Sequence, residues 1–96
     1  MKMNKYESVI IVNPNLSENE QKEIQKKYEK IITENGILKK TDVLGIKKLA
    51  YQIRNNKEGY YLVFCFESQS SFISELERKY RIDDNVMKFI TVKMEG

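Results

Sequence analysis

The sequence contains no histidine and no tryptophan, one cysteine, one proline, and four glycines spread along its 96 residues. Without histidine, the protein has no imidazole to serve as a general base or to bind a metal ion. A lone thiol forms neither an internal disulfide nor a zinc site of the usual kind, and glycines this far apart form no phosphate-binding loop. These absences argue against an enzyme with a cofactor or a small-molecule substrate, and they favour a binding protein.

Long hydrophobic runs are also missing: none approaches the about 20 residues that a membrane helix needs. The basic N-terminus leads into no small-residue cleavage site, so we expect no signal peptide. The single Cys65 is typical of a reducing compartment. We therefore expect a cytoplasmic protein without a membrane partner. Its 96 residues, 41% of them hydrophobic and 32% charged, suit a single domain over residues 1–96.

The first half of the chain reads as a strand, a helix and a second strand. Residues 6–12 are β-branched and aromatic, and their unbroken apolar end predicts a central strand. Ser17 and Glu20 form a capping-box pattern, which predicts the start of a helix. We expect Asn35-Gly36 to end it, with Gly36 in the left-handed conformation. The apolar stripe of this helix comprises Ile24, Tyr28, Ile31 and Ile32.

The second strand is followed by a third strand, a second helix and a fourth strand. Residues 37–53 are extended in character, and Gly45 predicts a bulge or bend within them. A hairpin connection at residues 54–59 leads to an antiparallel strand at residues 60–67. Hydroxyls at residues 68–71 predict the cap of a second helix, which is followed by a turn at residues 83–85 and a strand at residues 86–93. The stripe of the second helix comprises Phe72, Ile73, Leu76 and Tyr80.

The resulting order, β-α-β-β-α-β, predicts an α+β fold of the ferredoxin-like type. Right-handed crossovers place both helices on one face of a four-stranded antiparallel sheet. The other face then has no helix to cover it. We expect a partner to bind on that face or at its edges.

Positive charge gathers in one part of the chain. Residues 36–57 hold six basic side chains and one acidic one, which is typical of a surface that binds a polyanion. Basic residues on the first and last strands are expected to add to it, because those strands lie in the same sheet. For any one lysine, a solvated position that protects a sheet edge is the simpler interpretation. The candidate RNA-binding residues are Lys2, Lys5, Lys47, Lys48, Arg54, Lys57, Lys88 and Lys93.

Aromatic residues on the third predicted strand suggest an alternative. RNA-recognition motifs share this element order and stack bases on rings of their central strands. Here Tyr61 and Leu62 depart from that motif's third-strand pattern, and core packing explains most of the rings better. A stand-alone module for single-stranded RNA and a small-ligand or regulatory module both remain alternatives.

Four segments carry a resemblance to a known family. They read Asn-Pro-Asn-Leu at residues 13–16, Leu-Gly-Ile-Lys-Lys-Leu-Ala-Tyr-Gln-Ile at residues 44–53, Gly-Tyr-Tyr-Leu at residues 59–62 and Arg-Ile-Asp-Asp-Asn-Val at residues 81–86. With their spacing, the chain resembles ribosomal protein six of the bacterial small subunit from Tyr6 to Lys93. The segment at residues 44–53 is the most specific, although Leu44 stands where many members carry tryptophan.

The resemblance implies a structural, non-enzymatic constituent of the small ribosomal subunit with the same ferredoxin-like fold. It implies binding to the central domain of small-subunit ribosomal RNA as a heterodimer with small-subunit protein eighteen. Lys47 and Lys48 match the basic pair of the family motif, and Lys5 and Lys88 match further basic positions. The other four candidates rest on the location of charge alone.

Overall fold

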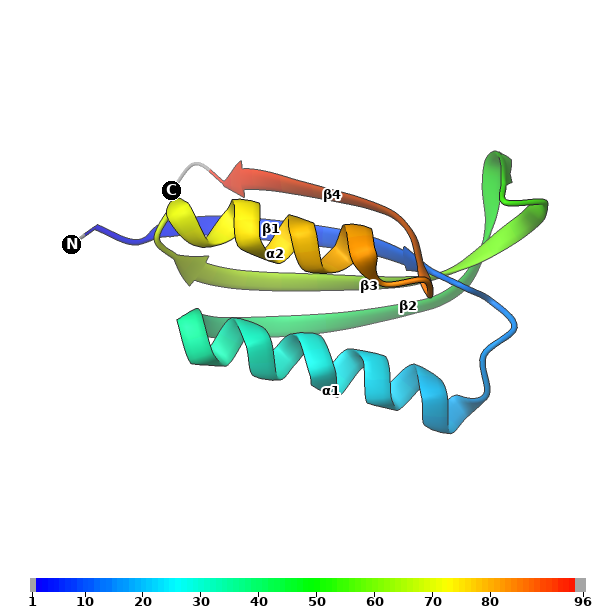
Figure 1. Ribbon diagram of the computed structural model, residues 1–96, viewed down its shortest axis with the longest axis horizontal. Helices are drawn as coiled ribbons and strands as arrows, with labels where there is room; N and C mark the ends of the chain where they lie inside the picture. Colours follow the sequence, from blue (N-terminus) through cyan, green and yellow to red (C-terminus); the bar gives the residue numbers. More distant parts are fainter. Residues whose placement is uncertain (1, 95–96) are drawn as a thin grey trace.

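Six elements follow one another in the order that the sequence predicts (Figure 1). The computed structural model describes residues 2–94. The elements are β1 (Asn4–Val12), α1 (Glu18–Asn35), β2 (Gly36–Ile53), β3 (Asn56–Ser68), α2 (Ser71–Ile82) and β4 (Val86–Met94). All strand pairs are antiparallel, in the order β2-β3-β1-β4, so β1 is central, as its apolar run predicted. The predicted α+β, ferredoxin-like arrangement is confirmed.

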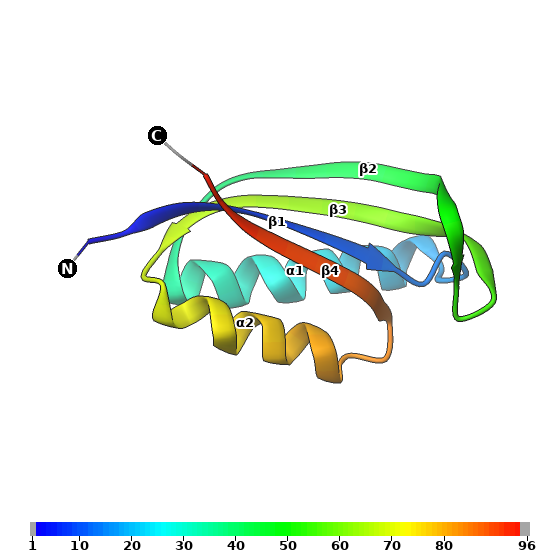
Figure 2. The ribbon, with the colours of Figure 1, turned by 90° about the horizontal axis from the view of Figure 1, so that it is seen from above.

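The two helices cover one face of the sheet and leave the other face bare (Figure 2). Because successive side chains of a strand point to opposite faces, each strand serves both. On β1, Tyr6, Ser8, Ile10 and Val12 alternate into the buried face. We call the face opposite the helices the open face; Lys5, Glu7, Val9 and Ile11 of β1 belong to it.

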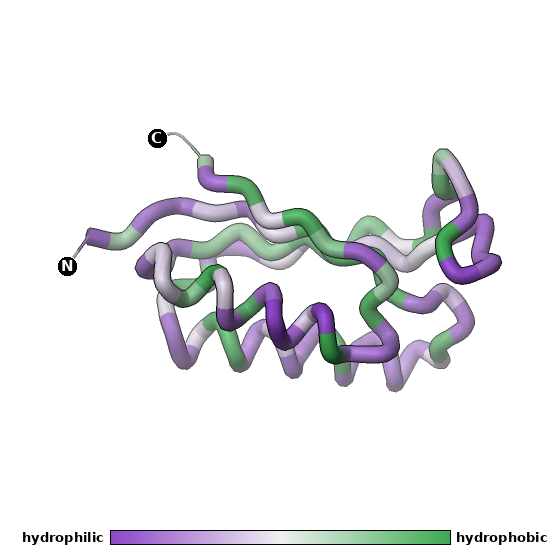
Figure 3. The backbone as a smooth tube through the Cα atoms, turned by 45° about the horizontal axis from the view of Figure 1, so that its top comes forward, coloured by the Kyte–Doolittle hydropathy of each residue, from purple (hydrophilic) through white to green (hydrophobic). Residues whose placement is uncertain are grey.

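The hydrophobic core lies between the sheet and the helices, where the predicted apolar stripes are found. Figure 3 shows α1 as mostly hydrophilic, with hydrophobic segments recurring along its length. The fully or nearly buried helix residues are Ile24, Tyr28, Ile32, Phe72, Leu76 and Tyr80, whereas Ile31 and Ile73 are partly buried at its margin. No helix within residues 2–94 is long and apolar enough to cross a membrane.

The ends of the helices confirm one prediction and overturn two. The Ser17 hydroxyl accepts from the Glu20 amide at 3.2 Å, and the Glu20 carboxylate accepts from the Ser17 amide at 3.2 Å, which is the predicted capping box. Gly36 is not left-handed: its φ of −175° is extended, and it is the first residue of β2. A side chain there would run into the Glu67 carbonyl oxygen, so close strand contact explains this glycine.

The predicted hydroxyl cap of the second helix is also wrong. Ser70 is the N-cap residue of α2, but its side chain makes no capping hydrogen bond. Ser68 is fully buried at the end of β3, where its hydroxyl donates to the Gln69 carbonyl at 3.1 Å. Ser68 therefore ends β3, whereas Ser71 begins α2. The residue type alone does not show which serine belongs to which element.

A polar cluster ties α1 to the turn between α2 and β4. The Asp83 carboxylate accepts from the Tyr28 hydroxyl, from the Lys27 ammonium at 3.1 Å and from the Asn85 amide at 3.0 Å. Burial alone would raise the pKa of the Asp83 carboxyl, but the hydrogen bonds from Tyr28, Asn85 and Lys27 outweigh it and hold this pKa below its usual value. Burial, together with the hydrogen bond to Asp83, raises the pKa of the Tyr28 hydroxyl.

Replacing Asp83 by Asn tests this cluster. We expect Asp83→Asn to lower the free energy of unfolding at pH 7 by about 1–3 kcal/mol, because it removes a charge that accepts several hydrogen bonds. Since the pKa of Asp83 is lower in the folded state, its stabilisation is complete above the unfolded-state value and is lost as the pH falls through the folded-state value. Urea denaturation should thus show the difference from wild type shrinking below about pH 4.

The matched control is Asp84→Asn at the next residue, whose side chain makes no hydrogen bond or ion pair with residues 2–94. It removes the same charge and should change the stability by less than about 0.5 kcal/mol. Equal losses in the two variants would mean that general charge, and not the contacts of Asp83, sets the stability.

Candidate nucleic-acid interface

The hairpin between β2 and β3 carries most of the candidate residues. Its turn consists of Arg54 and Asn55, both with positive φ, at 50° and 64°. The hairpin connection expected at residues 54–59 is therefore too long: β3 already begins at Asn56, and Gly59 lies within that strand. The predicted irregularity at Gly45 is confirmed, with a φ of +78° at a register shift between Val43 and Gly45.

Beyond Lys48, the hairpin leaves the regular ladder. Lys48 is opposite Glu58, and the next pair joins Ile53 to Asn56, so four residues of β2, 49–52, face only Lys57. The Leu49 side chain, 9% exposed, packs this segment onto the sheet. A Cβ at Gly59 would overlap the Ile11 side chain and approach Leu49 to 3.4 Å, so the missing side chain of Gly59 lets the hairpin pack closely on β1.

Adding a methyl group at Gly59 tests that packing. We expect Gly59→Ala to destabilise the fold by about 1–3 kcal/mol, because the methyl group overlaps Ile11 of the neighbouring strand. Glu58→Ala, at the exposed neighbouring position, is the control and should cost less than about 0.5 kcal/mol. Thermal unfolding of the three proteins measures the difference; a Gly59→Ala variant as stable as wild type would contradict the close packing.

Five of the eight candidate residues lie at the hairpin end of the sheet. Lys47 is opposite Gly59, and Lys88 is opposite Ile11, so both side chains lie on the open face. Lys48 is opposite Glu58 on the other face of the hairpin. Arg54 and Lys57 are exposed at the tip. We call Lys47, Lys48, Arg54, Lys57 and Lys88 the hairpin cluster.

The other three candidates lie at the opposite end of the sheet. Lys5 is opposite Met94, Lys93 is opposite Tyr6, and the exposed Lys2 precedes β1. Lys5 is six positions from Ile11, which is about 20 Å along β1 at about 3.4 Å per residue. The expectation that these three residues join the basic surface of the hairpin is therefore wrong: the first and last strands do share the sheet, but they run its whole length.

Two further lysines of the basic segment lie next to acidic partners. Lys39 is 3.4 Å from a Glu67 carboxylate oxygen, and Lys40 is 3.4 Å from an Asp42 carboxylate oxygen. Their charge is thus partly balanced within the chain. The basic residues of segment 36–57 that form no ion pair within residues 2–94 therefore all belong to the hairpin cluster.

Two hydrogen bonds tie members of the hairpin cluster to neighbouring elements. The Lys88 ammonium donates to the Tyr51 hydroxyl at 2.8 Å and lies 5.3 Å from the centre of the Tyr51 ring. That hydrogen bond raises the pKa of Lys88. The Arg54 guanidinium donates to the Asp84 carbonyl at 2.9 Å. Sequence reasoning missed both contacts, because residues 51 and 88 are 37 positions apart.

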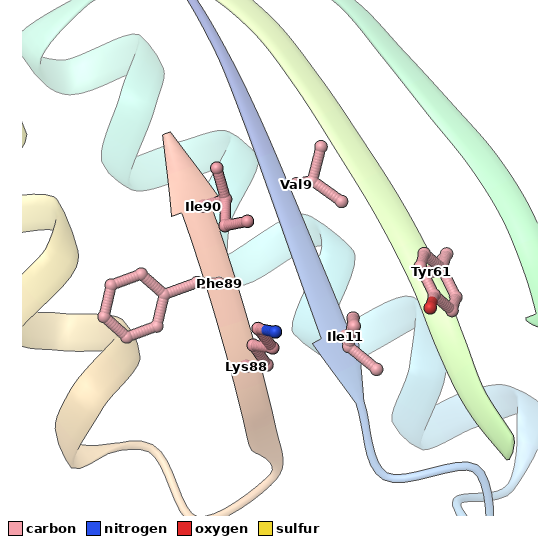
Figure 4. Close-up of a pocket in the computed structure, with 6 residues that line it drawn as sticks. All are labelled: Val9, Ile11, Tyr61, Lys88, Phe89 and Ile90. Atoms are coloured by element: carbon pink, nitrogen blue, oxygen red, sulfur yellow. The ribbon is translucent and has the colours of Figure 1, made fainter. Parts of the chain in front are cut away.

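The open face also holds an apolar hollow of about 280 Å³ next to Lys88. Figure 4 shows Val9, Ile11, Ile90 and Tyr61 around it, from three neighbouring strands, with Phe89 turned away toward α2. Farther along β4 the apolar surface continues through Val92 and Met94, which are 45% and 44% exposed. The sequence signal for this apolar surface is the alternation of apolar residues on β4. From the sequence alone, that segment predicts only a strand.

The rings of β3 mostly face the helices. Tyr60, Phe64 and Phe66 are 8%, 0% and 1% exposed and belong to the core, as expected. Of the four aromatic residues on β3, Tyr61 is the one that reaches the open face. Stacking of several bases on this strand is therefore not supported.

Within residues 2–94, no group of three or more Cys, Asp or Glu side chains is placed to hold a metal ion. Cys65 is half-buried on the open face, and burial raises the pKa of its thiol, which keeps it protonated and weakly nucleophilic.

The site combines a cationic hairpin with an apolar open face beside it. These features are typical of a small α+β binding protein.

Comparison with known proteins gives the family. The model of the family Ribosomal protein S6 matches residues 5–93. The small ribosomal subunit protein bS6 of Shouchella clausii is 39% identical over 94 residues, covering 97% of this chain and 99% of that protein. That of Helicobacter acinonychis is 40% identical over 95 residues, covering 98% of this chain and 67% of the relative.

A solved structure agrees. The crystal structure of 30S ribosomal protein S6 from Thermotoga maritima has a TM-score of 0.91 and 33% identity, with 97% of this chain and 89% of that chain covered. The chain belongs to the ribosomal protein S6 family. It is a non-enzymatic constituent of the small ribosomal subunit, and the predicted family is confirmed.

Proposed function

We propose that this protein binds the central domain of small-subunit ribosomal RNA in the cytoplasm, as a single domain paired with small-subunit protein eighteen. The observation that carries the proposal is the hairpin cluster, five basic residues at one end of a sheet whose open face is apolar beside it. The cluster suits phosphates, and the apolar face suits a polypeptide. Two neighbouring surfaces of different chemistry support two partners.

On the RNA side, the proposed interaction is electrostatic. Lysine and arginine side chains that contact phosphates release counterions, so affinity falls as the salt concentration rises. Such contacts position the protein without reading the base sequence, and specificity then comes from the shape of the folded RNA and from the second protein. Lys47 and Lys48 make no hydrogen bond or ion pair with residues 2–94, so both ammonium groups are available to phosphates.

Removing two charges from the hairpin tests this role. We expect Lys47→Ala with Lys48→Ala to weaken binding to central-domain RNA in the presence of protein eighteen. The slope of log affinity against log salt should become shallower by up to about two, because up to two phosphate contacts are lost. A salt titration of the affinity, for example by filter binding, measures both effects.

The matched control removes two charges at the far end of the sheet, Lys2→Ala with Lys93→Ala. This control has the same net charge as the hairpin variant and should keep the wild-type affinity and slope. Neither variant should shift the thermal midpoint by more than a few degrees, since all four side chains are on the surface. Equal weakening by both pairs would show that net charge alone, and not the hairpin, attracts the RNA.

On the protein side, we propose that protein eighteen docks on the open face over the hollow. The argument is the exposed apolar area at the hollow and along β4, which is unusual for a face in water and typical of an interface. Ile90, 54% exposed, projects from the middle of β4 into this surface.

Replacing Ile90 tests the docking surface. We expect Ile90→Gln to weaken binding of purified protein eighteen by about tenfold or more, because it puts an amide at the centre of an apolar contact. Ile82→Gln is the control: Ile82 is even more exposed, at 68%, but lies at the end of α2. Isothermal titration of both variants decides; a loss with Ile82→Gln and none with Ile90→Gln would place the partner on the helix side.

A further inference from the structure

Part of the basic hairpin has no ladder to hold it. Residues 49–52 face a single residue of β3, so the backbone hydrogen bonds that fix a regular hairpin are interrupted just before the tip. Lys57, Arg54 and Lys48 flank this segment. A two-stranded ribbon is only marginally stable by itself. Leu49 packs the base of this segment onto the sheet, but the residues beyond Leu49 are exposed or partly exposed. The orientation of the tip must therefore come from further contacts.

Tyr51 supplies one of these contacts. Its side chain is 63% exposed, so burial does not hold it in place. It accepts a hydrogen bond of 2.8 Å from Lys88 of β4, and the Lys88 ammonium also lies 5.3 Å from the ring centre. The two residues join the irregular part of β2 to the far edge of the sheet.

Arg54 supplies a second contact at the tip itself. Its guanidinium donates to the Asp84 carbonyl at 2.9 Å, in the turn that leads into β4. That turn is anchored on both sides: the Asp83 carboxylate accepts from Tyr28 of α1, and the Asn13 amide donates to the Asn85 carbonyl at 2.8 Å. Arg54 therefore holds the tip to a fixed part of the molecule. Figure 1 shows the hairpin turning toward the β4 side, as these contacts require.

We propose that Tyr51 and Arg54 are positioning residues: with Lys88 and Asp84 they form a clasp that fixes the basic hairpin in its RNA-binding orientation. The inference rests on the proposed function and adds to it. Tyr51 carries no charge, and its proposed effect on RNA affinity is through the placement of other residues. Arg54 is predicted to bind RNA because of its charge. It also acts through its hydrogen bond to the Asp84 carbonyl.

The clasp raises RNA affinity by reducing the conformational entropy that the hairpin loses on binding. A hairpin that moves freely must lose that freedom when its lysines contact phosphates, and the loss subtracts from the affinity. The clasp orders the hairpin before the RNA arrives. It also holds Lys88 on the same side as Lys47, so that two charges from different strands meet the RNA together.

Tyr51→Leu and Tyr51→Phe separate the parts of this contact. Leu removes the hydroxyl and the ring, whereas Phe removes the hydroxyl and keeps the ring. We expect backbone ¹⁵N order parameters at residues 49–57 to fall from about 0.85, typical of rigid backbone, toward about 0.6, typical of flexible segments. The fall should be similar in both variants, because both lose the hydroxyl that accepts from Lys88. RNA affinity should fall by about three- to tenfold with an unchanged salt slope, since no charge is lost.

Two controls complete the experiment. Lys57→Ala removes a charge from the tip, and the Lys57 side chain makes no hydrogen bond or ion pair with residues 2–94. This variant should make the salt slope shallower and leave the order parameters unchanged. Arg54→Lys keeps the charge but shortens the side chain that donates to the Asp84 carbonyl, so it should behave like the Tyr51 variants.

The outcomes are distinct. Wild-type order parameters in Tyr51→Leu would overturn the clasp. Lower order with wild-type RNA affinity would overturn its positioning role. If the wild-type protein with protein eighteen binds no central-domain RNA, the proposed function fails, whereas the order parameters still decide whether the clasp holds the hairpin.

Discussion

The structure depends on one constraint: two helices cover one side of a four-stranded sheet, and every strand alternates its side chains between that side and water. The buried side takes the rings and aliphatic chains that make the fold stable, among them Tyr28, Phe64 and Tyr80. The same alternation obliges the strands to present an equal number of side chains to the open face. On that face, Val9, Ile11 and Ile90 line an apolar hollow with Lys88 at one margin. In the function that we propose, one face of each strand stabilises the fold and the other binds partners.

Position along the strands matters as much as the face. Ten residues of a strand span about 33 Å, so charges at the two ends of β1 belong to different surfaces even though they lie in one sheet. Lys39 and Lys40, near the end of β2 that is far from the hairpin, lie next to acidic partners. Only the hairpin end combines unpaired lysines from β2 and β3 with Lys88 of β4. A net charge of +3 over the whole chain therefore conceals a local cationic surface.

Local patterns were read correctly where a local rule decides the structure. The capping box at Ser17, the helix stripes, the break at Gly45 and the central position of β1 all follow from hydrogen-bonding groups or apolar spacing within a few residues. The errors arose where a distant strand intervenes. Gly36 is required by the nearby Glu67 carbonyl and not by a helix end, and Gly59 by Ile11 and not by a turn. Both glycines suit a turn in the sequence, but in the fold they allow close contact between strands.

The sequence by itself determined the element order, the ferredoxin-like fold, the family resemblance and the excess of basic residues in the second strand and hairpin. It did so because helix periodicity, strand composition and short motifs are properties of neighbouring residues. Only the tertiary structure decided which lysines lie together, which apolar residues stay in water, and that Tyr51 meets Lys88 and Arg54 meets Asp84. Those contacts join residues 30 or more positions apart, and their geometry depends on strand register and on the irregular end of β2. Register and bulges are set by the packing of the whole sheet, which no local pattern records.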